Sequence, residues 1–342
     1  MRCPPSRRTS TRIPPIPSPS SGSCRTRTET RTRSSRSSIS RPRTARRWTV
    51  LALLRTTTEF LEERGVSEAR LSAEHLLAHV LGTGRLELYL SYDRPVGSDE
   101  LERYRALVRR RLADEPVAYI VGRTGFRDLD LAVDRRVLVP RPETELLVGQ
   151  VVEWARAEAA RGARPADGWR MLDVGTGSGA IACALATEVE AVAWIAGIDI
   201  SPDAVDLARA NARAVGADRT LWVVADGLGA LAPGLRVDAV VANPPYLALG
   251  ERETLPPEVE RWEPPGALFA GPAGDEEIRR LLHDAPGLLR SGGLLAFEVG
   301  LGQAGPARVR VEATPELEYV TTYRDHGGVE RGLLAVRARS GE

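Results

Sequence analysis

The sequence has no lysine, and all 47 of its basic residues are arginine. Its three cysteines, Cys3, Cys24 and Cys183, are an odd set without the spacing of a metal site, so we predict neither a disulfide framework nor a bound metal. No stretch reaches the roughly 18 consecutive apolar residues that cross a bilayer, and no apolar secretory segment opens the chain. These absences favour a cytoplasmic protein without membrane attachment.

Charge is unevenly distributed along the 342 residues, although the net charge is only +1. Residues 1–47 carry 13 arginines and a single acidic residue, Glu29. Residues 48–342 carry 34 arginines and 45 acidic residues, which gives this part a net charge of −11. Because an acidic body lacks the broad basic face that binds phosphate backbones, we expect no stable nucleic-acid binding by the folded part.

Residues 1–47 consist mainly of Arg, Ser, Thr and Pro, and a segment with so little to bury is predicted to be disordered. Three interpretations are open: an organelle transit peptide, a nucleic-acid tether, or upstream sequence translated from a misplaced start codon. We favour the misplaced start. Since the only methionine after Met1 is Met171, a start near Val50 requires a codon other than AUG.

Residues 48–118 are predicted to form a small helical domain. The stretch 76–81 has apolar side chains at helical spacing, and Gly82 follows where a glycine commonly ends a helix. A later helix is expected to begin at Ser98, with acidic residues in its first turn, and to end on the arginines of 109–111, so that both ends complement the helix dipole.

Residues 119–140 alternate and turn like a β-hairpin, and we interpret them as a connector between two domains. From about residue 168 onward, short apolar strands alternate with helical stretches, which is typical of a parallel sheet covered by helices on both faces. Ser201 and Pro202 suit the start of one of these helices. The expected strands are 170–174, 191–200, 220–225, 237–242 and 293–299.

A glycine-rich loop follows the first of these strands and leads directly into a helix. Glycines allow a ligand to approach the backbone closely, and Asp199 at the end of the next strand suits the two hydroxyls of a ribose. The spacing also satisfies the looser dinucleotide pattern, so two cofactor classes remain open. Asp173 before the loop would repel a pyrophosphate and suits the amino group of S-adenosylmethionine, which the additional glycine at 179 also favours. The loop comprises Gly175, Thr176, Gly177, Ser178 and Gly179.

The sequence Asn243-Pro244-Pro245-Tyr246 ends the fourth strand of the expected sheet. Loops at the carboxyl ends of such strands face the ligand crevice. Prolines remove N–H donors, so carbonyl groups and the Asn243 side chain remain as acceptors for a target NH₂ group. The Asn243 side-chain oxygen and the Pro244 carbonyl can each accept one N–H of the target. Both hydrogen bonds strengthen as positive charge develops on the target nitrogen, and Tyr246 is expected to pack against a flat target.

These motifs resemble those of class I S-adenosylmethionine-dependent methyltransferases that act on amino groups. The chain from about residue 50 resembles the release factor glutamine methyltransferases along nearly its whole length, on stretches such as "EPVAYIVGRTGF" (115–126), "VLVPRPETELLV" (137–148), "EVERWEPPGALFAG" (258–271) and "GGLLAFEVGLGQ" (292–303). The resemblance implies a Rossmann-like α/β methyltransferase domain at 141–342, and substrate recognition by the helical domain at 48–118.

The resemblance also assigns roles to residues. It implies that residues 175–179 and Asp199 hold the cofactor and that residues 243–246 hold the substrate glutamine. Asp226 is expected near the adenine, followed by Gly227 where the family often has an aromatic residue, which leaves that side of the pocket more open. Residues 140–145 are expected to border the site, where Arg141 and Glu145 either take part in it or form a structural ion pair.

The leading hypothesis is methyl transfer from S-adenosylmethionine to the N5 side-chain amide of the glutamine in the Gly-Gly-Gln motif of peptide-chain release factors, by a monomer. An adenine-N6 methyltransferase acting on DNA or RNA shares residues 243–246 but needs a basic groove. A non-catalytic scaffold is opposed by the intact cofactor motifs. A nicotinamide dehydrogenase has no use for Asn-Pro-Pro-Tyr.

Overall fold

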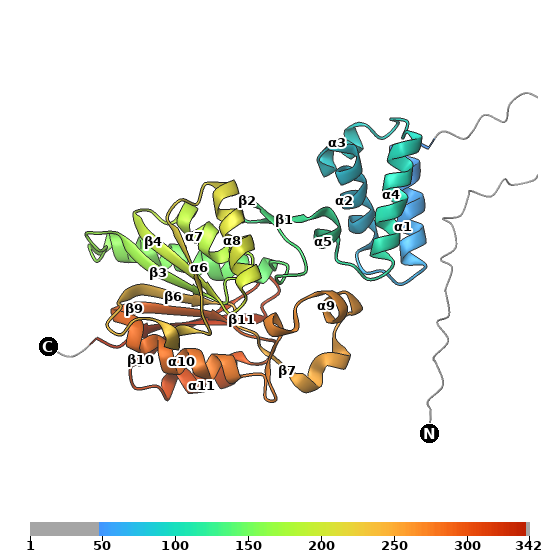
Figure 1. Cartoon of the computed structure of the whole chain (residues 1–342). Helices are drawn as coiled ribbons and strands as arrows, with labels where there is room; N and C mark the ends of the chain where they lie inside the picture. The colour runs from blue at the N-terminus through green and yellow to red at the C-terminus, as the bar shows by residue number, and fades with distance from the viewer. Residues whose placement is uncertain (1–47, 340–342) are drawn as a thin grey trace, which may run out of the picture. The chain divides into compact units, whose positions relative to one another are not determined.

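The computed structural model describes residues 48–339, so the interpretations of residues 1–47 lie outside the described residues. The described chain divides into two compact units, one ending at Ala113 and one beginning at Asp114 (Figure 1). The sequence placed this boundary at residue 118.

The first unit is helical. Its helices are α1 (Val50–Glu62), α2 (Ala69–Leu81), α3 (Arg85–Leu90) and α4 (Ser98–Arg111). The prediction that Gly82 ends a helix is confirmed, because Gly82 adopts a left-handed conformation (φ 66°) that a glycine tolerates without strain. The predicted helix from Ser98 to the three arginines is also confirmed, and Glu100 accepts from the N–H of Gly97 at its start (2.8 Å).

The connector is a hairpin over a shorter range than predicted. Strands β1 (Arg123–Phe126) and β2 (Leu129–Ala132) pair antiparallel. The prediction is wrong at both ends of 119–140. Residues up to Val121 belong to α5 (Val117–Val121), which Gly122 ends at a φ of 79°. After Ala132 the chain leaves the hairpin and turns, with the N–H of Val137 donating to the carbonyl of Asp134 (3.1 Å).

The second unit contains a seven-stranded sheet with the order β10-β11-β9-β6-β3-β4-β5. Every paired neighbour runs parallel except β11, which is antiparallel to both β9 and β10. The predicted α/β fold with a mostly parallel sheet is confirmed, and all five predicted strands are present. The strands are β3 (Trp169–Val174), β4 (Val192–Asp199), β5 (Thr220–Val224), β6 (Val237–Ala242), β9 (Leu289–Glu298), β10 (Leu317–Arg324) and β11 (Glu330–Arg337).

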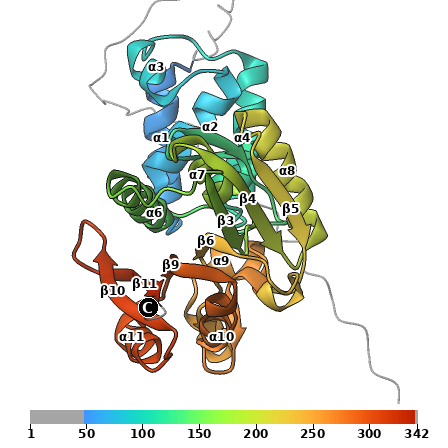
Figure 2. The same ribbon diagram turned by 90° about the vertical axis from the view of Figure 1, so that its left-hand side faces the viewer.

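Helices cover both faces of this sheet (Figures 1 and 2). One face carries α6 (Pro142–Ala160), α7 (Ala180–Glu188) and α8 (Pro202–Val215), and the other carries α10 (Glu276–Leu288) and α11 (Ala304–Glu312). Ser201 caps α8, its side chain accepting from the N–H of Ala204 (3.2 Å), as predicted. The remaining elements are η1 (Leu228–Ala230), β7 (Leu247–Ala248), η2 (Leu249–Thr254), α9 (Pro257–Trp262), η3 (Pro265–Ala267) and β8 (Phe269–Gly271).

The strand order reverses at β3. From β3 the chain first builds outward through β4 and β5, and then returns to place β6 on the opposite side of β3. Ligands of open α/β sheets bind at such a reversal, outside the carboxyl ends of the strands. Because Val174 of β3 pairs with Ala242 of β6, the glycine loop and the Asn-Pro-Pro-Tyr loop leave the sheet side by side. Within residues 48–339, no helix combines the length and apolarity needed to cross a bilayer.

Candidate active site at the carboxyl edge of the sheet

The glycine loop forms an open turn after β3. Gly175 and Gly177 have φ values of 73° and 54°, which few other residues adopt. A Cβ atom added at either position would meet only a carbonyl oxygen at van der Waals distance, 3.9 and 4.0 Å, so no side chain packs against the backbone there. Asp199 fixes the turn from β4, since its Oδ2 accepts from the N–H of Gly177 and its Oδ1 from the N–H of Ser201 (both 2.9 Å). The loop and Asp199 therefore come together as the sequence predicts.

Gly179 has a packing role. A Cβ atom there would lie 2.9 Å from the Trp222 ring and 3.0 Å from the Cβ of Ala208. Gly197 on β4 has a similar role that sequence reasoning missed, because its missing side chain leaves room for Trp222 and for the Thr176 hydroxyl. The absence of side chains at Gly179 and Gly197 allows α8 and Trp222 of β5 to pack closely against the glycine loop and β4.

Asp173 lies under the glycine loop with its side chain fully buried. Its Oδ2 accepts from the Thr176 hydroxyl (2.6 Å) and from the N–H of Ala182 (3.1 Å), which ties the loop to the first turn of α7. Its Oδ1 is buried without a hydrogen-bond partner. Burial raises the pKa of this carboxyl to about 7.

Asp226 and Gly227 follow β5. The Asp226 carboxylate accepts from the Arg280 guanidinium of α10 at 2.5 Å. A Cβ atom at Gly227 would lie 3.0 to 3.1 Å from that guanidinium. The space beside Gly227, which the sequence suggested would be open, is therefore occupied by Arg280.

The Asn243 side chain is held by a chain of hydrogen bonds. Its Nδ2 donates to the Thr144 hydroxyl of α6 (3.0 Å), which in turn donates to Oε2 of Glu298 at the end of β9 (2.8 Å). Sequence reasoning placed Thr144 only within the stretch 140–145 expected to border the site and assigned no role to Glu298, although both lie in the stretches that carry the family resemblance. A lone acidic residue at the carboxyl end of a buried strand was the available signal for Glu298.

Tyr246, at the other end of the Asn-Pro-Pro-Tyr loop, is held by the segment that follows β9. The Gln303 side chain donates through Nε2 to the carbonyl of Tyr246 (2.7 Å) and accepts from the N–H of Gly300 (3.0 Å). A Cβ atom at Gly300 would lie 2.9 Å from the Tyr246 ring. Burial raises the pKa of Tyr246 to about 12, so its hydroxyl stays protonated at neutral pH.

Arg141 forms an ion pair with Glu263. Its Nη2 lies 2.6 and 2.7 Å from the carboxylate oxygens of Glu263, whose side chain is buried. Of the two alternatives left open for Arg141 and Glu145, an ion pair between them does not form, because Arg141 precedes α6 and points toward the segment after α9. The Glu145 carbonyl accepts from Arg127 instead (2.9 Å).

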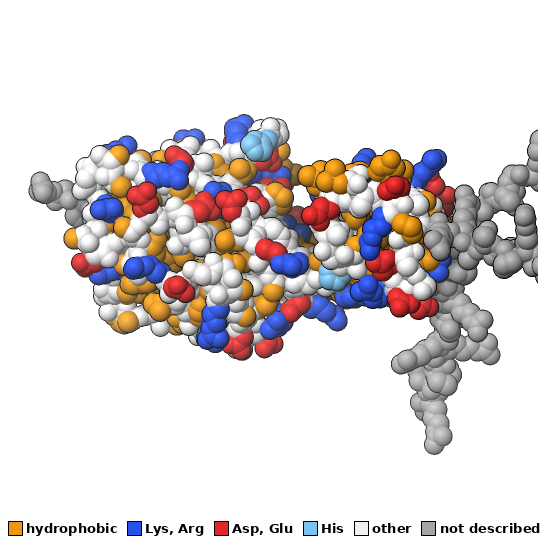
Figure 3. Space-filling view, turned by 90° about the horizontal axis from the view of Figure 1, so that it is seen from above, with side chains coloured by type: hydrophobic (Ala, Val, Ile, Leu, Met, Phe, Trp, Pro, Cys, Tyr) orange, Lys and Arg blue, Asp and Glu red, His pale blue; other side chains and the backbone are white. Residues whose placement is uncertain are grey.

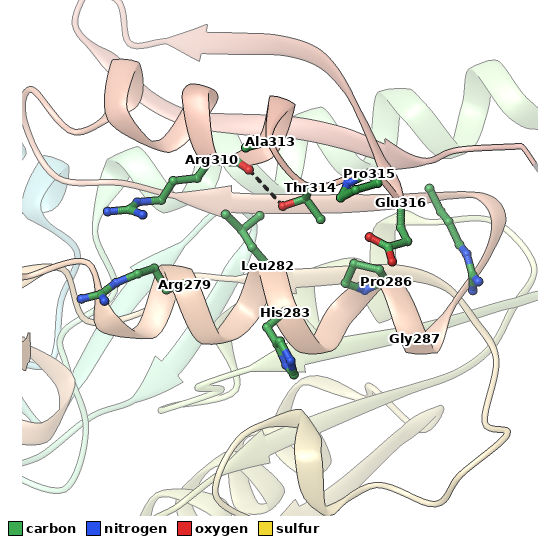
Figure 4. A pocket seen from close by; sticks show the side chains of 11 residues that line it. Arg279, Leu282, His283, Pro286, Gly287, Arg310, Ala313, Thr314, Pro315 and Glu316 are labelled. Atoms are coloured by element: carbon green, nitrogen blue, oxygen red, sulfur yellow. Dashed lines mark hydrogen bonds between the residues drawn. The ribbon is translucent and has the colours of Figure 1, made fainter.

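A surface cavity of about 610 Å³ lies elsewhere on the same unit (Figure 4). It is lined by α10 and by the end of α11 with the segment that follows, including His283 and Arg310. None of the predicted site residues lines it, so it does not enter the chemistry at the sheet edge. On the face seen in Figure 3, arginines and acidic residues are interspersed over both units.

Two family models match the chain. The PrmC N-terminal domain matches residues 52–122, and a methyltransferase domain matches residues 165–284. The release factor glutamine methyltransferase of Chlorobaculum tepidum is 45% identical over 290 residues, which cover 84% of this chain and 96% of that protein. Those of Rhodopirellula baltica and Geobacter sulfurreducens are each 38% identical, covering 85% and 83% of this chain and 97% and 95% of their own lengths.

The chain belongs to the family of release factor glutamine methyltransferases. It is a methyltransferase with S-adenosylmethionine as the methyl donor. A solved structure supports the fold: the catalytic domain of hMettl16 in complex with the MAT2A 3′UTR hairpin 6 has a TM-score of 0.50 at 16% identity, over 66% of this chain and 82% of that chain.

The residues at the sheet edge fit this cofactor. No side chain packs against the backbone at Gly175 and Gly177, and each oxygen of the Asp199 carboxylate retains a lone pair that can accept from a ribose hydroxyl. The unpartnered Oδ1 of Asp173 is an acceptor that suits an ammonium group.

Proposed function

We propose that this methyltransferase modifies the N5 side-chain amide nitrogen of the glutamine in the Gly-Gly-Gln motif of peptide-chain release factors. The names of its relatives support release factors and glutamine as the substrate class. The observation that carries the proposal is the orientation of Asn243, whose Nδ2 is engaged by Thr144, so that its Oδ1 remains to accept from a substrate NH₂ group.

The cofactor would be held by residues 175–179, Asp199, Asp226 and Gly227, with Asn243 at the boundary to the substrate. When bound, S-adenosylmethionine supplies a methyl group on a positively charged sulfur. The predicted contact of Asp173 with the amino group has to use Oδ1, the oxygen without a partner. This oxygen is buried, so the contact requires it to become accessible when the cofactor binds.

The chain's contribution to the chemistry is orientation and electrostatic stabilisation. An amide nitrogen is a weak nucleophile, and holding both of its hydrogens fixes the direction of its lone pair. We assign this role to Oδ1 of Asn243 and the carbonyl of Pro244, with Pro245 stiffening the loop and Tyr246 packing against the planar amide. Positive charge on the nitrogen strengthens both hydrogen bonds during transfer, so they stabilise the transition state most, and one of the two N–H protons leaves the nitrogen after the methyl group has been transferred.

The test uses labelled S-adenosylmethionine with three acceptors: a release factor, the same factor with its Gly-Gly-Gln glutamine changed to alanine, and adenine-containing DNA and RNA. We expect label in the unmodified release factor alone. Label in nucleic acid alone would support the adenine-N6 alternative and reject the proposal. Light scattering of the purified protein checks the expected monomer, and its location in cell fractions checks the expected cytoplasmic site.

Asn243→Ala tests the residue that carries the proposal. We expect the turnover number on the release factor to fall by about a hundredfold, as for loss of one donor or acceptor in a transition-state site. Calorimetry should find the affinity for S-adenosylmethionine within about threefold of wild type. Unchanged turnover with intact cofactor binding contradicts the role given to Asn243.

A further inference from the structure

Two buried side chains from distant parts of the chain converge on Asn243. Thr144 lies in the first turn of α6 and Glu298 is the last residue of β9, and the exposed fractions of these residues are only 4% and 3%. Thr144 Oγ1 lies 3.0 Å from Asn243 Nδ2 and 2.8 Å from Glu298 Oε2. The three groups therefore form a continuous hydrogen-bonded chain that ends on the loop expected to hold the substrate.

The chemistry of the three groups determines which of them donates and which accepts along this hydrogen-bonded chain. An ionised carboxylate only accepts, so the single hydroxyl hydrogen of Thr144 is donated to Glu298. The Thr144 oxygen then accepts, which requires the NH₂ end of the Asn243 amide to face it. The opposite orientation of the amide would bring Oδ1 to an oxygen that has no hydrogen left to donate. It would also present an NH₂ group to the substrate's own NH₂ group.

We infer that Thr144 and Glu298 are positioning residues, which hold the Asn243 amide with its oxygen toward the NH₂ group to be methylated. The inference rests on the proposed function, since it assigns the substrate as a group with hydrogens to donate. Neither residue touches the reacting atoms. Both act by determining which end of the Asn243 side chain faces them.

The surroundings of Glu298 determine when it is ionised. Burial raises the pKa of Glu298 to about 7, and the nearby carboxylate of Glu143 adds to the effect. The hydrogen bond from Thr144 and the charges of Arg331 on β11 and Arg141 before α6 act in the opposite direction. Arg331 also pairs with Glu143 (3.1 Å) and Asp325 (2.7 Å), so its charge is shared among three acids.

Two phenol groups complete these surroundings. The hydroxyls of Tyr246, on the loop after β6, and Tyr323, on β10, both lie near enough for the Glu298 charge to raise their pKa values. Both phenols therefore stay neutral at neutral pH. Of Glu298 and these two phenols, Glu298 is the group whose protonation changes close to pH 7.

The first experiment compares Thr144→Val, Thr144→Ser and Thr187→Val. The valine at 144 removes the link while keeping the shape, and we expect the turnover number on the release factor to fall about tenfold, with the KM for S-adenosylmethionine unchanged. Serine restores the hydroxyl and should return turnover to within about threefold of wild type. Thr187 is the matched control, because its hydroxyl bonds only to carbonyls of its own helix α7 (3.0 and 3.1 Å).

The second experiment compares the pH dependence of turnover in wild type and Glu298→Gln at saturating cofactor. Below pH 7, protonated Glu298 can itself donate to Thr144. The Thr144 hydroxyl hydrogen is then no longer committed to Glu298, so the orientation of the Asn243 amide is no longer fixed. Because loss of the link is expected to leave about a tenth of the turnover, wild-type turnover should fall about fivefold relative to the variant between pH 8 and pH 6 as the ionised fraction falls. Asp173 is present in both proteins, so the difference between the profiles reports on Glu298. Glu158→Gln, at the far end of α6, is the control.

A third measurement needs no substrate. In wild type the side-chain NH₂ protons of Asn243 should exchange slowly with solvent by NMR, and the exchange should accelerate at least tenfold in Thr144→Val but not in Thr187→Val. The inference is overturned if Thr144→Val and Thr187→Val have equal turnover numbers and equal exchange rates. It is also overturned if the pH profiles of turnover in wild type and Glu298→Gln run parallel. If wild type methylates no release factor while the Asn243 protons behave as expected, the proposed function fails and the hydrogen-bond chain stands.

Discussion

Replacing Asp173 with asparagine should make the protein more stable at alkaline pH and weaken cofactor binding. The carboxyl is fully buried, and burial raises its pKa from an ordinary value of 3.8 to about 7. Since one pH unit of difference equals about 1.4 kcal/mol, the folded state disfavours the ionised form by about 4 kcal/mol. Asparagine keeps an acceptor for Thr176 and Ala182 but carries no charge to bury.

The sign of the pH dependence follows from the direction of this pKa change. Because the folded pKa lies above the unfolded one, the contribution of Asp173 to stability is fully present below about pH 4 and is lost as the pH rises to about 7. Asparagine has no such dependence. The stability of Asp173→Asn relative to wild type should therefore rise by roughly 3 kcal/mol between pH 5 and pH 8.5.

Urea unfolding followed by tryptophan fluorescence measures this difference. Five of the six tryptophans lie in the second unit, which also contains Asp173. Asp238→Asn is a suitable control. Asp238 is also buried, but its carboxylate accepts from the N–H of Arg170 (2.7 Å) and pairs with Arg290, so its loss should destabilise the protein at both pH values. If the stability difference between Asp173→Asn and wild type is the same at pH 5 and pH 8.5, the account of Asp173 is wrong.

Three other substitutions test the packing beneath and beside the site. Gly197→Ala should lower the free energy of unfolding by 2 kcal/mol or more in urea titrations, as an added Cβ atom would collide with the Trp222 ring. Arg141→Ala should cost about 3 kcal/mol, because it leaves the buried Glu263 carboxylate unpaired, and replacing Glu263 with glutamine as well should recover part of this loss. Ser201→Ala should cost about 1 kcal/mol by removing the cap of α8, measured by thermal unfolding.

The sequence predicted the parallel part of the sheet well, because each of its strands contains a short apolar run, and β3 and β4 are followed by helices of the right period. Strands β10 and β11 were not predicted. β10 alternates irregularly between exposed and buried residues, as in "LEYVTTYR", and an edge strand of this kind lacks the continuous apolar run of an inner strand.

The sequence predicted the parts of the candidate site that lie in local motifs, and it missed the contacts between residues far apart in the chain. The meeting of the glycine loop with Asn243 follows from the rule that loops at the carboxyl ends of parallel strands share one edge. The contacts of Thr144 do not follow from any local pattern, because Thr144 lies 99 residues from Asn243 and 154 from Glu298. The partner of Arg141 was missed for the same reason, since Glu263 lies 122 residues away.

The pairing of Val174 with Ala242 has a consequence for how such enzymes diverge. Because the glycine loop and the Asn-Pro-Pro-Tyr loop follow two paired residues of neighbouring strands, their separation is set by main-chain geometry, which side-chain replacement leaves intact. With the roles proposed above, a change of methyl acceptor would then need changes only in residues 243–246 and the side chains that hold them, and the glycine loop could stay as it is.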